Sequence, residues 1–103
     1  MGVQISMSNN PTTDLFITLK TWPQYWDALE DGRKTFEIRR CDRPFCVGAV
    51  LLLQRWDPEK YDYTYDETGH PKTLARRVTY IMRGIDQFGL STDYVAMGLQ
   101  NVD

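Results

Sequence analysis

The chain has 103 residues, of which 42 % are hydrophobic and 25 % charged, and this composition predicts one soluble globular domain. The formal net charge of −2 argues against a protein that coats duplex nucleic acid, because such proteins must neutralise many phosphates. No stretch is long and apolar enough to span a membrane and no secretion signal is recognisable, so we expect a cytoplasmic protein.

The N-terminal segment 1–14 is polar and lacks any periodicity. It is predicted to be a flexible tail that precedes a single domain over residues 15–103. Within the domain, apolar side chains alternate through residues 15–20, which predicts a first β-strand.

A helix is predicted to follow over residues 22–31. Thr21 has the side chain of an N-cap residue, and Gly32 can adopt the left-handed conformation that ends a helix. Trp26 and Leu29 recur at helical spacing and are predicted to be buried. The aromatic residues of this segment are interpreted as core rather than as a platform for a ligand.

The next segment alternates with a period of two residues, as a strand does. Phe36 and Ile38 are predicted to share an apolar face, while Glu37 and Arg39 share the opposite, charged face. Lys34 has the parity of Phe36, so it reaches the charged face only if it precedes the regular strand or lies at a bulge. A lysine, a carboxylate and an arginine within six positions could bind an anionic or amide-bearing ligand. The alternative is a surface strand whose charges form a cross-strand ladder.

Three more strands are predicted further along the chain. Residues 49–56 form an apolar run typical of a central strand, and residues 73–83 and 94–99 alternate. The connection over 60–72 contains three alternating tyrosines, which either stack on bases or pack against the sheet. Five strands and one helix predict a mainly β, α+β fold, a small and partly open β-barrel.

The basic residues of the chain are concentrated. Five of them lie within eleven positions: Arg33, Lys34, Arg39, Arg40 and Arg43. The stretch 57–67 is acidic instead. The sequence therefore predicts a local positive cleft on an acidic protein, suited to a small anionic ligand or a short single strand.

The cysteines point to no cofactor. Cys41 and Cys46 are predicted to be reduced, buried thiols, since a chain of this size needs no disulfide. Together with the single His70 they match no zinc spacing. We predict neither a metal nor another cofactor.

The segment Gly32-x-Lys34-x-x-Glu37-x-Arg39 resembles the G-x-K-x-x-E-x-R signature of ASCH domains, relatives of the RNA-binding PUA domains. Further segments fall in the order seen in a small bacterial and phage-borne branch of that superfamily: 19–23, 42–45, 47–48, 56–58, 78–81 and 88–90. The resemblance implies a PUA-like β-barrel of about five strands with one main helix.

The resemblance also implies a ligand cleft between the helix and the signature strand. Lys34, Glu37 and Arg39 would surround it, with Glu37 accepting from the exocyclic amine of a nucleobase and Lys34 contacting a phosphate or a carbonyl. Trp56 or a tyrosine would stack on the base. We therefore expect a domain that binds RNA, single-stranded nucleic acid or a nucleoside.

Whether the chain is also an enzyme stays open. Some small ASCH proteins are amidohydrolases that remove the acyl group from N4-acetylcytidine, and in this alternative Lys34 and Glu37 would be nucleophile and base. Glu37 stands where those enzymes carry a threonine, which argues against the same activity here. A protein-interaction domain that uses the tyrosine-rich connection is a third hypothesis.

Overall fold

The computed structural model describes residues 15–84 and 86–102, so the tail predicted over 1–14 lies outside the described residues. The elements in chain order are β2 (Phe16–Thr21), α1 (Pro23–Glu30), β3 (Phe36–Arg40), β4 (Val50–Asp57), β5 (Asp62–Tyr63), β6 (Thr73–Arg83), the 3-10 turn η2 (Asp86–Phe88) and β7 (Tyr94–Asn101).

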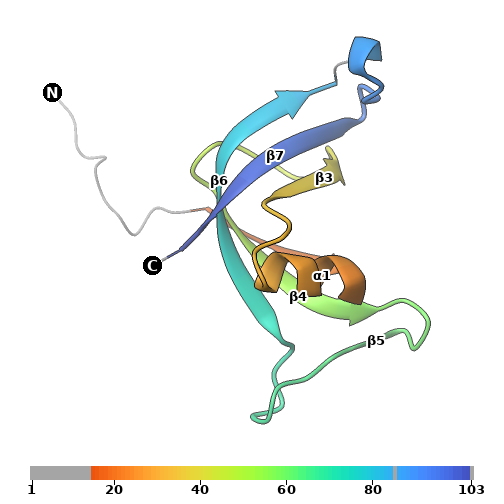
Figure 1. Ribbon diagram of the computed structural model, residues 1–103, viewed down its shortest axis with the longest axis vertical. Coiled ribbons are helices and arrows are strands. Elements are labelled where there is room, and N and C mark those ends of the chain that lie inside the picture. Colours follow the sequence, from red (N-terminus) through yellow and green to blue (C-terminus); the bar gives the residue numbers. More distant parts are fainter. Residues whose placement is uncertain (1–14, 85, 103) are drawn as a thin grey trace, which may run out of the picture.

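The strands form one six-stranded mixed sheet in the order β2-β4-β6-β7-β3, with β5 paired to β4 outside this path. Strand β2 runs parallel to β4, and the other neighbours are antiparallel. Figure 1 shows the strongly curved sheet, with α1 beside β4. The predicted mainly β, α+β fold with a single main helix is confirmed. Within the described residues no ladder joins the end strands β2 and β3, so hydrogen bonds do not close the sheet into a barrel.

Helix α1 packs its inner face on the centre of the sheet. Trp26 and Leu29 are buried, as predicted, and the indole Nε1 of Trp26 donates a hydrogen bond of 2.8 Å to the carbonyl of Leu53 on β4. The predicted central strand is confirmed, since β4 lies between β2 and β6. The core consists mainly of Ile17, Leu19, Trp26, Leu29, Phe45, Leu51, Leu53, Val78, Val95 and Met97.

The two ends of α1 differ from each other in how well they were predicted. Thr21 does not cap the helix: it is the last residue of β2, and the N-cap is Trp22, which makes no side-chain cap bond. Pro23 begins the helix, so Trp22 before it is the N-cap, and the Thr21 hydroxyl accepts a hydrogen bond from Arg39 instead. At the other end Gly32 has φ +88°, the left-handed conformation predicted for it. This turn sends the chain directly into β3.

Strand β6 departs from strict alternation. Its pairing with β7 shifts between Val78, which faces Leu99, and Tyr80, which faces Gly98. One extra residue, Thr79, makes a β-bulge there. As a result Val78 is buried and Tyr80 is exposed although both have the same parity, so the prediction of unbroken alternation over 73–83 is wrong at this point.

The loop between β3 and β4 holds both cysteines. Cys41 and Cys46 are free thiols as predicted, but both are exposed, so their predicted burial is wrong. The residue of this loop that is buried in the core is Phe45. No helix of the described residues is long and apolar enough to cross a membrane.

Candidate functional site

A cavity of about 630 Å³ opens where the end of β2 and the start of α1 face β3. Its lining combines charged and aromatic side chains: Lys20, Thr21, Trp22, Tyr25, Lys34, Phe36, Glu37, Ile38, Arg39, Arg40 and Tyr94. Its volume lies in the range of small-molecule sites in proteins, roughly 300–1,000 Å³.

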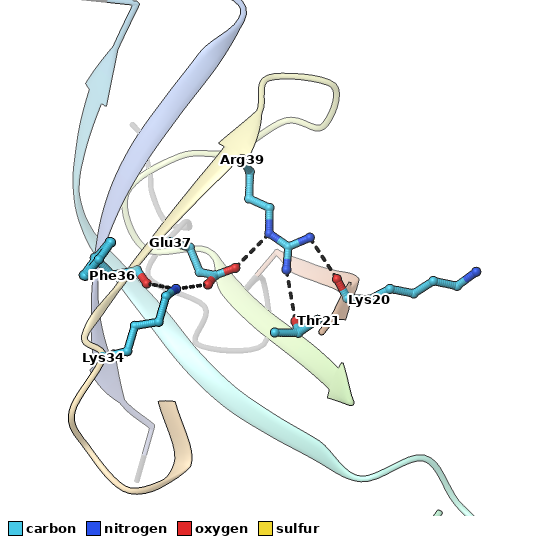
Figure 2. Close-up of polar contacts among 6 residues, drawn as sticks. All are labelled: Lys20, Thr21, Lys34, Phe36, Glu37 and Arg39. Carbon is cyan, nitrogen blue, oxygen red and sulfur yellow. Dashed lines mark hydrogen bonds and ion pairs between the residues drawn. The ribbon is translucent and has the colours of Figure 1, made fainter. Parts of the chain in front are cut away.

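A buried carboxylate lies in this cavity between two cations. Glu37 is only 4 % exposed. Its Oε2 accepts from Lys34 Nζ, and its Oε1 accepts from Arg39 Nε at 2.8 Å. Lys34 Nζ also donates to the carbonyl oxygen of Phe36 at 2.6 Å (Figure 2). The expected convergence of Lys34, Glu37 and Arg39 in one cleft is confirmed.

The position of Lys34 follows from local structure. Its backbone N–H donates to the carbonyl of Ala28, so the turn after Gly32 folds back against α1. Regular pairing of β3 begins only at Phe36. Lys34 therefore precedes the strand, and its ammonium group reaches Glu37 although the two residues differ in parity. This is one of the two solutions that the sequence allowed.

Arg39 connects the two end strands of the sheet. Its Nη1 donates to the carbonyl of Lys20 at 2.9 Å and its Nη2 to the Thr21 hydroxyl at 3.0 Å (Figure 2). Thr21 is 2 % exposed. With Nε bound to Glu37, the guanidinium bridges β3 to β2 where no ladder joins them. Thr21 thus accepts a hydrogen bond in the site instead of capping the helix.

The aromatic residues around α1 divide between the core and the cavity. Trp22 and Tyr25 are about half-exposed and stacked, with ring centroids 6.1 Å apart and planes 20° apart. Phe36 and Ile38, from the apolar face of β3, are about half-exposed as well. The interpretation of the whole aromatic stripe as core is therefore wrong for Trp22 and Tyr25. Trp22 is the N-cap residue with an extended backbone, ψ 148°, so it precedes the regular helix that buries Trp26 and Leu29.

The other basic residues predicted for the cleft, Arg33, Arg40 and Arg43, do not all line the cavity. Arg40 lines the cavity, with its guanidinium 5.4 Å from the ring centroid of Tyr94. Arg43 lies beyond this cavity and donates to the carbonyl of Thr18 at 3.1 Å. Arg33 lies away from the cavity: its side chain is 71 % exposed and pairs with Asp31 at 2.9 Å.

Trp56 also lies outside the cavity lining, in contact with the tyrosine-rich connection. Its ring centroid is 4.8 Å from that of Tyr63 and 5.1 Å from that of Tyr61, both edge to face. Tyr63 pairs with Trp56 through β5, as the packing alternative predicts, whereas Tyr61 is 80 % exposed. The tyrosine-rich connection is therefore packed against β4 at Tyr63 and exposed at Tyr61.

Several lining residues were not predicted from the sequence: Lys20, Thr21, Trp22, Tyr25, Phe36, Ile38 and Tyr94. A signal existed for some of them, because segment 19–23 stands out as a motif beside the signature. The motif indicated that this segment matters. It did not indicate which of its side chains face the cavity, because that depends on how β2 ends and α1 begins.

The Asp27–Arg55 ion pair, outside the cavity, anchors α1 to the sheet. Arg55 of β4 donates to both carboxylate oxygens of Asp27, each at 3.0 Å, and to the Thr64 hydroxyl at 2.7 Å. This hydrogen bonding from Arg55 is the main reason why the pKa of Asp27 lies below its ordinary value. Neither Asp27 nor Arg55 lines the cavity. This pair therefore supports the helix that carries Trp22 and Tyr25.

A family model described as a domain of unknown function, DUF3850, matches residues 17–99. The matched region contains every residue that lines the cavity, from Lys20 on β2 to Tyr94 on β7. No curated protein matches the sequence.

Proposed function

The chain belongs to the DUF3850 family, and we propose that it binds a nucleobase in the cavity between α1 and β3, as a nucleoside or within a single-stranded nucleic acid such as RNA. One observation carries the proposal. A buried carboxylate held by two cations lies beside exposed aromatic side chains in one cavity of suitable size.

The charged cluster is more than stability requires. Burying Glu37 with Lys34 and Arg39 costs desolvation, and hydrophobic side chains of similar volume would often stabilise a domain as well or better. A cluster of this kind in an open cavity favours recognition of a polar group. The carboxylate fixes the positions of both cations before a ligand arrives, which lowers the entropic cost of binding.

Hydrogen-bonding capacity remains for a ligand. Each carboxylate oxygen of Glu37 accepts one bond from a cation, and a carboxylate can accept about four in total. Lys34 uses two of its roughly three donors, on Glu37 and on the Phe36 carbonyl. An acceptor beside a donor complements a Watson–Crick edge on which an exocyclic amine stands next to an unprotonated ring nitrogen, as in cytosine and adenine but not in guanine. We propose selectivity for such bases.

The aromatic side chains complement the faces of a base. Trp22 and Tyr25, from the start of α1, and Phe36, from β3, all line the cavity and are about half-exposed. Stacking of one base on one aromatic ring contributes about 1–3 kcal/mol. Glu37 and Lys34 would form hydrogen bonds with the edge of the base, and the aromatic rings would stack on its face.

We further propose that the domain is of the ASCH type within the PUA-like superfamily. Support comes from the signature: Gly32 makes the left-handed turn, and Lys34, Glu37 and Arg39 meet beside α1, where the resemblance puts the ligand cleft. Bridging of β2 and β3 by a side chain rather than by a ladder suits a partly open barrel.

Hydrolysis of an N4-acylated cytidine is the second candidate. It is favoured by the direct contact between Lys34 and Glu37, which a nucleophile and its base would need. Against it, Glu37 takes the position of the threonine in the enzymes that the signature resembles, so binding is the preferred proposal.

Titration of the protein with cytidine, adenosine, uridine and guanosine, followed by NMR of the indole and backbone amides, tests the proposal. We expect shifts at Trp22 and along β3, strongest for cytidine or adenosine. Glu37→Gln should reduce the preference for these two bases, and Arg33→Gln, outside the cavity, is the matched control and should change nothing. If no nucleoside and no short RNA or DNA strand shifts any cavity resonance at millimolar concentration, the proposal is wrong.

A further inference from the structure

A second pocket, of about 430 Å³, adjoins the first. The two share the side chains of Lys20, Arg39 and Arg40 as lining. Arg43 and Tyr63 line only the second pocket. Because three residues belong to both, a ligand in the first cavity needs only a short extension to reach the second.

The second pocket carries an excess of positive charge. Four cationic side chains line it, against one carboxylate, that of Asp42. Arg39 is already paired with Glu37. Within the described residues, Lys20, Arg40 and Arg43 form no ion pair with a carboxylate. Uncompensated cations around a polar hollow favour an anionic group.

Aromatic rings hold one of these cations in place. The Lys20 ammonium lies 4.0 Å from the ring centroid of Trp56 and 5.9 Å from that of Tyr63, which are cation–π contacts. Figure 2 shows the Lys20 side chain running away from Glu37, with the Arg39 guanidinium between them. Trp56 thus positions a charge next to the second pocket.

We propose that the second pocket binds the phosphate attached to the nucleoside that the first cavity holds. The ligand class is then a nucleoside phosphate, either a free nucleotide or a phosphodiester within a single strand. This inference rests on the proposed function and adds to it: the phosphate meets Lys20, Arg40 and Arg43, while the base meets Glu37 and Lys34.

Calorimetric titration separates binding of the base in the first cavity from binding of the phosphate in the second pocket. The probes are cytidine, its 3′- and 5′-monophosphates and the dinucleotide CpC, with the adenosine series in parallel. We expect at least one monophosphate or the dinucleotide to bind about tenfold more tightly than the nucleoside, as a charge-assisted hydrogen bond or two would give. For a strand, three uncompensated cations predict a slope of log affinity against log salt of about −2.

Variants then assign the gain to the second pocket. Arg43→Gln should remove most of the increase in affinity that the phosphate gives. It should leave the affinity for the nucleoside within about twofold of the wild-type value, since Arg43 lines only the second pocket. Trp56→Leu should reduce the gain about threefold by freeing Lys20. Arg33→Gln, a charge change outside both pockets, is the control and should keep the full gain.

The outcomes distinguish this inference from the proposed function. If nucleosides bind and a phosphate adds nothing, the inference is wrong and the proposed function stands. If nucleosides, monophosphates and dinucleotides all fail to bind, both are wrong. Equal losses of nucleoside and nucleotide affinity in a folded Arg43→Gln protein would also overturn the inference. A dinucleotide that binds more tightly than either monophosphate identifies a strand as the source of the phosphate.

Discussion

Replacement of Arg39 by alanine should destabilise the domain more than any other single change at the surface of the site. The guanidinium makes three hydrogen bonds, to Glu37, Lys20 and Thr21, and two of them reach across to β2. Each such bond contributes about 0.5–1.5 kcal/mol net, or more with a charged partner. Alanine would also leave the buried Thr21 hydroxyl without this partner. Since the Arg39 side chain is itself 23 % exposed, we expect a loss of about 2–4 kcal/mol in the free energy of unfolding.

Urea denaturation at neutral pH measures this loss. Arg40→Ala is the matched control: Arg40 is the next residue on β3, its main contact is with the Tyr94 ring, and its loss should cost less than about 1 kcal/mol. Arg39→Lys should recover only part of the stability, because an ammonium cannot reproduce the planar fork. Equal unfolding free energies for Arg39→Ala and Arg40→Ala would refute the idea that this side chain holds β2 to β3.

Three further predictions concern the helix and the chemistry of the site. Because the pKa of Asp27 is lowered in the folded protein, the Asp27–Arg55 pair stabilises the fold above the ordinary pKa of the carboxyl, and this contribution is lost as the pH falls through the lowered value. Asp27 is about half-exposed, so Asp27→Asn should cost only about 0.5–1 kcal/mol at pH 7 in urea melts and close to nothing once the pH lies below the lowered pKa. Trp26→Phe removes the buried indole bond to Leu53 and leaves a void, and should lower the unfolding free energy by about 2–3 kcal/mol in the same assay; a loss within error of zero would contradict the packing described. Incubation with N4-acetylcytidine, followed by chromatography, should show little or no cytidine. Turnover that disappears in Lys34→Ala would show instead that the protein is an enzyme.

The parts of the fold that depend on local patterns were predictable. The burial of Trp26 and Leu29 follows from helical spacing, and Gly32 ends the helix region because it tolerates a positive φ. The central position of β4 follows from its apolar run. Each of these features is determined by a few neighbouring residues and one general rule.

Features that depend on two distant segments were not predictable. The role of Thr21 changes from helix cap to acceptor because Arg39, eighteen positions later, reaches across from β3. The bulge at Thr79 has no marker in the sequence, since its effect is a register shift against β7. Pairing register arises from the whole sheet, so a strand read by itself gives the wrong face beyond such a point.

Strand β3 is the clearest case. Alternation places Glu37 and Arg39 on one face and Phe36 and Ile38 on the other, as predicted, yet the carboxylate is buried and the two apolar residues are about half-exposed. If hydrophobicity alone decided burial, Phe36 and Ile38 would face the core and Glu37 would face solvent. It keeps its orientation because two cations and a bridged end strand compensate the buried charge.

The same guanidinium therefore serves the fold and the site. Arg39 holds β3 to β2 in place of a ladder, and it also lines both pockets. A ligand in either pocket would contact the guanidinium that bridges β2 to β3, so binding should stabilise the arrangement of β2 and β3 that it selects. Saturating ligand should raise the unfolding free energy by RT ln(1 + [L]/Kd), about 2.7 kcal/mol at one hundred times Kd. Part of that gain in free energy should appear as slower hydrogen exchange in β2, which Arg39 bridges to the strand proposed to contact the base.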